Sequence, residues 1–440
     1  MKTQNHLFED IILVTPDKNG RITTTDHAYV SVRGNTIHYA GQSFEMAIDG
    51  FNGAAYERYD GRNRMLLPAL ANIHGHLAMT LFRNQADDRN LHDWLFNVIF
   101  PREERLDETI VYTGTLLGIA EMIRSGTGAA ADMYYYDEVV AQAALAAGFR
   151  LNFSCDAKKL RPDGQYDLLP QLLADRMKQY AGHPSDLLRV SLLVHSIYLY
   201  EDALYPELAA LAETLNCPVQ IHVSETIQEV SECVEKYGCR PPQQLEKFGF
   251  FRTPTLAAHC TFLDDDDRSI LAKSPVVVAH NPSSNLKLGS GIADLAAMID
   301  AGLNVGLGTD GAGSNNNLDL YREMRLAALL AKGTAGDAAK LSAGQLLDMA
   351  SRIGMAGLGF ANSGRITAGA DADLQIMRCD VPSMTPLGDP VAALVYSSDA
   401  SLVESLMVQG RFLLYKGELR TIDEEKLLAE ARQAAKRLNA

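Results

Sequence analysis

The chain has 440 residues, of which 47% are hydrophobic and 22% charged, with a mean hydropathy of −0.08. That length allows about three domains, or one barrel of roughly 250 residues with a smaller domain beside it. The composition excludes disordered, fibrous and disulfide-scaffold proteins. Forty Lys and Arg against 55 Asp and Glu give a net charge of −15, which argues against nucleic acid as a partner.

Targeting and membrane signals are missing from the sequence. The first 20 residues contain no apolar run followed by a small-residue cleavage site, and no segment approaches the roughly 18 apolar residues of a membrane span. The six cysteines are sparse and form no C-x-x-C pair, which favours reduced thiols. We therefore expect a cytoplasmic protein with a small-molecule substrate and no membrane partner; a homo-oligomer is left open.

The two ends of the chain share one pattern. Residues 1–65 and 366–425 contain short alternating strands separated by Gly and Asn turns, which is typical of antiparallel sheets. Neither piece is long enough to support a core by itself. We expect the two to form one small composite β domain, a β-sandwich, and residues 426–440 to close the chain as an amphipathic helix.

The middle of the chain, residues 66–365, alternates short apolar runs with segments of helical period. This alternation predicts an α/β fold with a parallel sheet, and eight runs predict a (β/α)8 TIM barrel. The runs are nearly continuous in apolar character, as strands covered on both faces should be. They span 65–74, 127–136, 150–157, 189–198, 217–225, 254–260, 274–282 and 303–311.

Six of the 11 histidines lie where predicted barrel strands end: His74, His76, His195, His222, His259 and His280. In barrel enzymes the loops after the strands form the active-site face, so polar side chains gathered there indicate a site. A single histidine in such a position would more often be an ordinary core residue. The remaining five histidines are interpreted as ordinary.

Four side chains at these strand ends suggest a metal site. His74 and His76 are one residue apart, so on an extended strand both imidazoles point to the same side. His222 supplies a third imidazole, and Asp310, in GLGTDG, supplies a carboxylate. Three His and one Asp leave room for a water molecule, whose pKa a divalent ion can lower to about 7. Nitrogen and oxygen ligands suit zinc, iron or manganese, so the ligands by themselves leave the metal open.

Three side chains are candidates for catalysis. Glu225, in HVSET, follows the strand of His222 and could carry a proton from water to substrate, although a helix-capping role is the alternative. His259 fits an electrophilic or orienting group. Asp310 could bind the metal and also exchange a proton, since a ligating carboxylate keeps one oxygen free. His280 is left as a residue behind the site.

These motifs resemble the amidohydrolase superfamily, and within it the 5-methylthioadenosine/S-adenosylhomocysteine deaminases. The resemblance runs through ANIHGHLAMT, WLFNVIFPREE, HVSET, AAHC, AHNPSSN and GLGTDGAGSNNNLDL. It implies a distorted barrel, one divalent ion on the four predicted ligands, and catalytic roles for Glu225 and His259. We expect this ion to be zinc, with iron or manganese as the alternatives. It further implies that Glu103 binds ribose hydroxyls and that His195 contacts the purine ring; Trp94 is counted with them as substrate-binding.

The implied reaction is hydrolytic deamination of adenosine, methylthioadenosine or S-adenosylhomocysteine, with release of ammonia. Two departures from the family pattern affect specificity. LLVHSIY replaces the usual G-P-H-x-P-Y around His195, and Cys155 stands where some relatives have an arginine that holds the substrate's tail. The alternatives are an aminohydrolase or chlorohydrolase of another ring (pterin, guanine-like base, cytosine or triazine) and a barrel that binds without catalysis.

Overall fold

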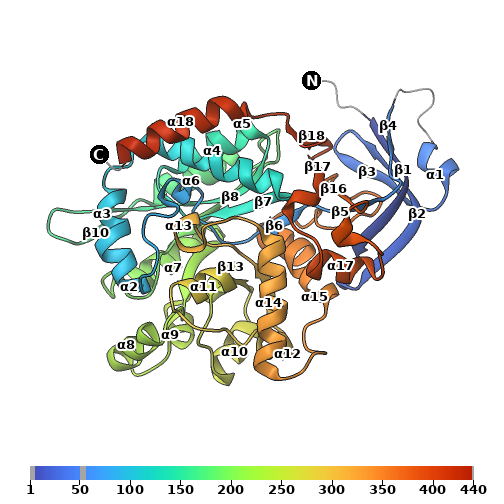
Figure 1. Ribbon diagram of the computed structural model, residues 1–440. Helices are drawn as coiled ribbons and strands as arrows, with labels where there is room; N and C mark the ends of the chain where they lie inside the picture. The colour runs from blue at the N-terminus through green and yellow to red at the C-terminus, as the bar shows by residue number, and fades with distance from the viewer. Residues whose placement is uncertain (1–4, 50–55, 439–440) are drawn as a thin grey trace.

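A computed structural model describes residues 5–49 and 56–438 of the protein. They form an eight-stranded barrel covered by helices, with a nine-stranded sheet at one side (Figure 1). Blue strands from the beginning of the chain and red strands from its end lie together in that sheet (Figure 1). The predicted α/β fold, with a barrel and a small β domain built from both chain ends, is confirmed.

The barrel strands are parallel and adjacent in chain order. They are rich in Ala, Val and Leu and almost entirely buried, because helices cover the outside and side chains fill the inside. The first and last strands meet where Ile73 donates its N–H to the carbonyl of Leu307 at 3.0 Å. The strands are β6 (Leu70–Asn72), β7 (Thr127–Asp132), β8 (Arg150–Cys155), β11 (Leu188–Leu193), β12 (Val219–Val223), β13 (Thr255–His259), β14 (Val276–His280) and β15 (Asn304–Leu307).

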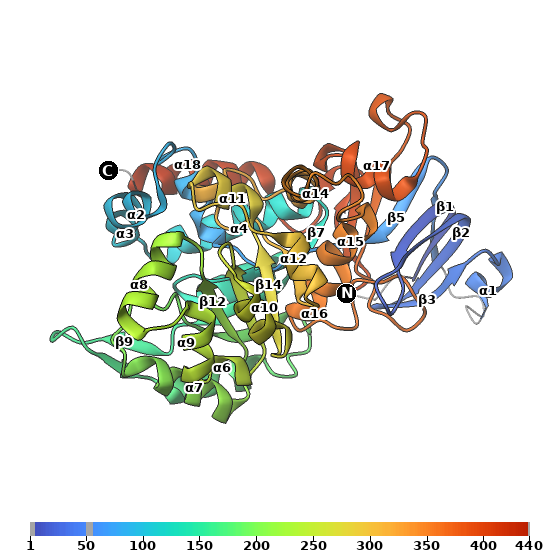
Figure 2. The same cartoon turned by 90° about the horizontal axis from the view of Figure 1, so that it is seen from below.

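Helices connect and surround these strands (Figure 2). Both α8 and α14 begin at a residue whose side chain accepts a backbone N–H of the first turn and end at a left-handed glycine; in α14 these residues are Asp319 and Gly336. The helices are α1 (Phe44–Ile48), α2 (Leu91–Trp94), α3 (Phe100–Glu103), α4 (Glu108–Arg124), α5 (Asp137–Ala147), α6 (Pro170–Tyr180), α7 (Leu204–Leu215), α8 (Ile227–Tyr237), α9 (Pro241–Phe248), α10 (Asp265–Ala272), α11 (Pro282–Lys287), α12 (Leu295–Asp300), α13 (Ala312–Asn315), α14 (Leu320–Ala335), α15 (Ala343–Asp348), α16 (Gly354–Gly357), α17 (Pro390–Tyr396) and α18 (Glu424–Leu438).

The small domain is one continuous sheet with its own apolar core. Most pairs are antiparallel, but β1 pairs in parallel with both β4 and β5, so the expectation of purely antiparallel pairing is wrong there. The chain reaches these partners by a crossover through β2, β3 and α1, and such a connection brings strands together in parallel. The strands are β1 (Asn5–Pro16), β2 (Ile22–Arg33), β3 (Thr36–Gly41), β4 (Tyr56–Asp60), β5 (Arg64–Pro68), β16 (Leu374–Arg378), β17 (Val403–Val408), β18 (Arg411–Tyr415) and β19 (Glu418–Leu419).

The predicted first barrel strand, residues 65–74, is in fact two strands in two sheets. β5 ends at Pro68 and pairs with β1 and β16, whereas β6 begins at Leu70 and pairs with β7. Proline has no N–H to continue a ladder, and the chain changes sheets at Ala69. Residues 66–68, assigned to the barrel from sequence, therefore lie in the small sheet. The other predicted domain limits stay predictions. Residues 1–4 and 439–440, at the ends of the predicted terminal segments, lie outside the described residues.

The last helix, α18, packs against α4 along the outside of the barrel (Figure 1). Its buried face follows the helical period through Leu427, Ala431 and Ala434, and Arg124 of α4 forms an ion pair with Glu424. Within residues 5–49 and 56–438, no helix is long and apolar enough to cross a membrane. The six cysteines, all in this part of the chain, are free thiols.

Candidate metal and catalytic site

Five predicted site residues come together at the carboxyl ends of the barrel strands. His74 and His76 follow β6, His222 lies within β12, His259 ends β13, and Asp310 follows β15. The β6 strand ends at Asn72, so the two histidines of the H-x-H pair lie just beyond it. His259 and Asp310 have φ of +70° and +61°, a left-handed backbone that costs energy in residues with a Cβ and often marks functional positions.

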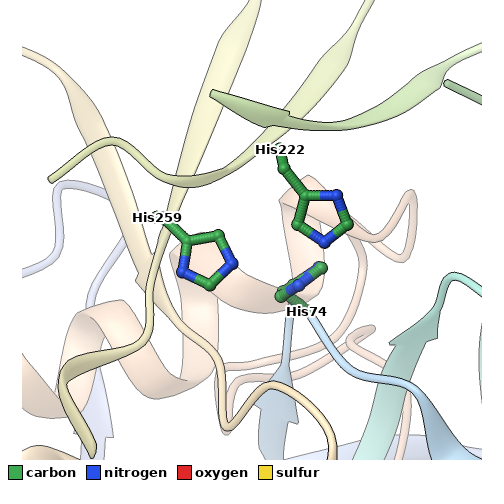
Figure 3. Close-up of side chains that lie close together, drawn as sticks. All are labelled: His74, His222 and His259. Carbon is green, nitrogen blue, oxygen red and sulfur yellow. The ribbon is translucent and has the colours of Figure 1, made fainter. Parts of the chain in front are cut away.

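The imidazoles face a common point, as Figure 3 shows for His74, His222 and His259. Possible ligand atoms of these three residues lie within 4.8 Å of one another, and the same holds for His74, His76 and Asp310. The Oδ1 atom of Asp310 lies 3.4 Å from Nε2 of His74 and 3.2 Å from Nε2 of His76. Spacings of this size fit donors around one ion.

The donor chemistry also fits a metal. His76 and His222 each place Nδ1 against a backbone carbonyl, of Met133 at 2.6 Å and of His195 at 2.7 Å. Because such an Nδ1 must carry the proton, the Nε2 lone pair of each ring is directed at the common point. Nε2 of His74 is buried and has no hydrogen-bond partner among the described residues.

The Asp310 carboxylate and the imidazoles of this cluster shift one another's pKa values. Burial opposes the charged form of His76, yet the Asp310 carboxylate outweighs it and raises the pKa of His76 to about 9. Burial would likewise raise the pKa of Asp310, but the neighbouring imidazoles of His74 and His76 hold that pKa well below its usual range. A metal ion that binds here replaces the imidazole proton, because metal ligands must be deprotonated.

The second carboxylate oxygen of Asp310 is occupied. Oδ2 accepts hydrogen bonds from the hydroxyls of Ser284 and Ser314, each at 2.6 Å. Only Oδ1 faces the histidines. The serines therefore orient the carboxylate and limit the proton exchange that the sequence suggested for the free oxygen.

Glu225 lies beside this cluster and is 5% exposed. Its Oε2 is 3.8 Å from Nε2 of His259, and its Oε1 accepts a hydrogen bond from Ser290 at 3.3 Å. Burial raises the pKa of Glu225, which brings a carboxylate closer to the range useful for proton transfer. Nδ1 of His259 lies 2.7 Å from the amide oxygen of Asn285, which fixes the ring and aims Nε2 at Glu225 and the cluster.

A cavity of about 850 Å³ opens over the cluster. Its wall includes the three predicted substrate-binding residues, Trp94, Glu103 and His195, together with several tyrosines. His280 is buried behind the cluster and is not among the described residues that line this cavity. The cavity is large enough for a nucleoside with a substituent, since small-molecule pockets commonly measure about 300–1,000 Å³.

Two of these wall residues have unusual surroundings. Burial raises the pKa of Glu103 to about 7, although the nearby hydroxyls of Tyr134 and Tyr135 oppose the shift. The indole N–H of Trp94 is buried without a partner among the described residues. An unpaired buried polar group costs energy unless a ligand or water satisfies it, and this applies to the Trp94 indole N–H.

Comparison with known proteins identifies the family. The model for the "Amidohydrolase family" matches residues 65–413. The chain belongs to the amidohydrolase family. This family membership makes it a hydrolase of carbon–nitrogen bonds, as predicted, and with the donor set above it supports a divalent metal ion at the site.

Named relatives are similar over nearly the whole chain. A 5-methylthioadenosine/S-adenosylhomocysteine deaminase from Acetivibrio thermocellus is 41% identical over 380 residues, covering 86% of this chain and 88% of the relative. A 5'-deoxyadenosine deaminase from Methanothermobacter thermautotrophicus is 41% identical over 381 residues, covering 86% and 88%. The crystal structure of an adenosine deaminase from Xanthomonas campestris with bound zinc superposes with a TM-score of 0.92 at 31% identity, covering 99% of each chain.

Several residues of this amidohydrolase site were missed from sequence. Ser284, Ser314, Asn285 and Ser290 are polar residues in loops or short helices, where no period distinguishes them. Asp132, at the end of β7, accepts the N–H of Leu77 at 2.7 Å, and burial raises its pKa to about 7. A carboxylate at the end of an apolar strand was the signal that could have found Asp132.

Proposed function

We propose that this amidohydrolase catalyses metal-dependent hydrolytic deamination of an adenosine-type nucleoside: adenosine, methylthioadenosine or S-adenosylhomocysteine. The convergence of four imidazoles and two carboxylates under one cavity carries the proposal. The named activities of the relatives support the substrate class.

The metal is assigned to His74, His76, His222 and Asp310, as one zinc ion per chain. Three nitrogen donors and one oxygen donor are a common ligand set for a catalytic zinc ion, although iron or manganese would also suit it. A divalent ion bound there lowers the pKa of water to about 7 and so supplies a nucleophile at neutral pH.

Glu225 carries protons in this scheme. It takes a proton from the attacking water and delivers it to the ring nitrogen beside the carbon that bears the exocyclic amine. The water oxygen forms a bond to that carbon, and the second proton of the water then passes to the exocyclic amine. The bond between the carbon and this amine breaks, the oxygen remains as a carbonyl, and ammonia leaves. The raised pKa of Glu225 suits this proton exchange, because an efficient proton carrier has a pKa near the working pH.

His259 and Asp310 stabilise the tetrahedral centre that develops at the ring carbon. The Asn285 oxygen holds His259 from behind, so its Nε2 is already aimed when charge develops. The two serine hydroxyls hold Asp310 in the same way. Preorganised groups of this kind need no rearrangement during the reaction.

Glu103, His195 and Trp94 are assigned to substrate binding. The Glu103 carboxylate accepts hydrogen bonds from the ribose hydroxyls, and the His195 ring contacts the purine. The Trp94 indole N–H donates a hydrogen bond to the substrate. The imidazole of His195 lies against that of His222, with ring centroids 4.6 Å apart, so it borders the reacting end of the cavity.

The identity of the group beyond the ribose depends on the wall near Cys155. That thiol is buried and is not among the described residues that line the cavity. Lys158 and Asp156 line the wall instead, joined by an ion pair of 2.5 Å.

The cytoplasmic location is predicted from the sequence alone. The same holds for the prediction that nucleic acid and membranes are not partners, and for the possible homo-oligomer.

The test is a substrate panel with zinc-loaded protein and an ammonia assay. We expect turnover of at least one of the three nucleosides and much slower turnover of adenine, guanine, cytosine, a pterin and a triazine. Turnover of the bare rings alone would replace the nucleoside assignment with the heteroaromatic alternative. If neither the nucleosides nor the bare rings are turned over, the remaining interpretation is a barrel that binds without catalysis.

A further inference from the structure

Glu229 is a buried acid that the proposed chemistry does not use. It lies in the first turn of α8 and is 5% exposed. Its Oε1 accepts the backbone N–H of Ser224 and its Oε2 accepts the backbone N–H of Glu225, each at 2.8 Å. A single carboxylate therefore holds two successive peptide groups of the turn that carries the predicted proton carrier.

Capping the helix does not require this arrangement. The cap of α8 is Thr226, whose hydroxyl accepts the N–H of Glu229 at 3.1 Å. The Glu229 carboxylate reaches past that cap to the two preceding residues. An acid in the first helical turn is favourable by itself, but pairing with both of these N–H groups fixes the geometry of the turn rather than of the helix.

The turn needs such support. Ser224 has φ of +48°, a left-handed conformation that is unfavourable for a residue with a Cβ. On the other side, the carbonyl of Ser224 accepts the N–H groups of Thr261 and Phe262, each at 3.1 Å, which joins it to the turn after His259. The two bonds to Glu229 and the two bonds to the Ser224 carbonyl hold this turn from opposite sides, and we call the Glu229 pair the clamp. Removing it would release one side of the turn.

We propose that Glu229 is the positioning residue for Glu225. By fixing the peptide groups of Ser224 and Glu225, it keeps the Glu225 carboxylate directed at His259 and the metal-binding cluster. A proton carrier must lie within hydrogen-bond reach of the atoms it serves, and a misplacement of about 1 Å can cost roughly 100-fold in rate. This inference rests on the proposed function of Glu225.

The variant Glu229→Gln tests the clamp. The amide has nearly the same size and keeps one acceptor oxygen, but its NH2 group faces the second backbone N–H as another donor, so one of the two bonds is lost. We expect kcat for the best nucleoside to fall about tenfold or more, with KM within about twofold and metal content unchanged. Retention of kcat within about twofold of the original would overturn the proposal.

The matched control is Thr226→Ala, which removes the cap of the same helix and leaves the clamp in place. We expect a lower melting temperature and kcat within about twofold. If this variant loses as much kcat as Glu229→Gln, helix stability explains the effect and the positioning role is wrong. Should Glu229→Gln fail to fold, Glu229→Asp replaces it, because the shorter side chain keeps the carboxyl group but cannot reach both N–H groups.

Amide hydrogen exchange of the metal-loaded full chain provides a readout without substrate. Peptides that cover residues 224–225 should exchange faster in the Glu229 variant than in the original protein or in Thr226→Ala. Unchanged exchange there would overturn the clamp. If the original protein deaminates no nucleoside, the proposed function fails, while this measurement still decides whether Glu229 fixes the turn.

Discussion

Both ends of the barrel contain a cavity, and the two differ in the ionisable residues that line them. The cavity of about 850 Å³ at the carboxyl ends combines histidines, carboxylates and tyrosines with apolar side chains. The cavity of about 510 Å³ at the amino ends is lined largely by aliphatic side chains, glycines and the prolines that precede three strands, Pro218, Pro254 and Pro275. The same strands thus carry two different chemistries at their two ends.

The two cavities differ in how the charges of their side chains are compensated. At the amino end, Arg189 forms an ion pair with Asp186 at 2.8 Å and donates to the carbonyl of Gly359, so its charge is compensated locally and partly by solvent. At the carboxyl end, burial raises the pKa of Glu103 and Glu225. Desolvated, shifted groups in a cleft are a mark of function, whereas compensated charges are a mark of stability.

Among changes at the carboxyl end of the barrel, removing the metal should reduce activity most. Dialysis against a chelator is expected to abolish ammonia release, and one equivalent of zinc should restore it, because the proposed nucleophile depends on the ion. Zinc should also raise the melting temperature, since a ligand that binds only the folded state stabilises it. Full activity in chelated protein, verified by metal analysis, would contradict the assignment.

Changing the proton carrier comes next. Glu225→Gln keeps size and burial but cannot accept a proton, so kcat should fall by about 1,000-fold while metal content stays the same. Glu232→Gln, at an exposed position on α8, is the matched control and should leave kcat within about twofold. The cap of α8 is Thr226, so the helix-capping alternative for Glu225 is wrong, and an active Glu225→Gln enzyme would show that Glu225 carries no proton in the reaction.

The ribose contact separates nucleosides from bare bases. Glu103→Gln should raise KM for nucleosides by roughly 10- to 100-fold, because hydrogen bonds to a charged group contribute about 1.5–3 kcal/mol. KM for any base that is turned over should stay within about twofold. Equal losses for both substrate classes would show that Glu103 shapes the cavity instead of reading the ribose.

The pH dependence of KM sharpens the same assignment. Burial raises the pKa of Glu103 to about 7, so its carboxylate, the form that accepts two ribose hydroxyls, is populated above that pH. KM for nucleosides should therefore rise as pH falls through about 7 and level off above it. Glu103→Gln should lose this dependence; its persistence in the variant would assign the titration to another group.

The smallest effect is expected at the amino end. Arg189→Gln removes a partly exposed ion pair, which contributes at most about 1 kcal/mol to stability. The melting temperature should fall slightly, and kcat and KM should stay within about twofold. A large loss of activity in this variant would show that the two ends are coupled and would break the contrast between them.

Much of the fold could be predicted because its signals are local. Apolar runs separated by helical period indicate strands and helices wherever they fold, and eight of them predicted the barrel. The sheet pairings were less predictable: one apolar run, residues 65–74, was divided between two sheets, and β1 gained parallel partners. Pairing depends on the path of the chain between strands, which no local pattern contains.

The sequence by itself determined which donors are available at the strand ends, and from it we predicted His74, His76, His222 and Asp310 as ligands and Glu225 as the second carboxylate. Only the tertiary structure decided how each donor is held. Ser284 reaches Asp310 across 26 residues of chain, and Glu229 turns back onto the peptide groups of Ser224 and Glu225. Such hydrogen bonds arise when barrel closure brings separate loops together, so the spacing of residues along the chain does not reveal them.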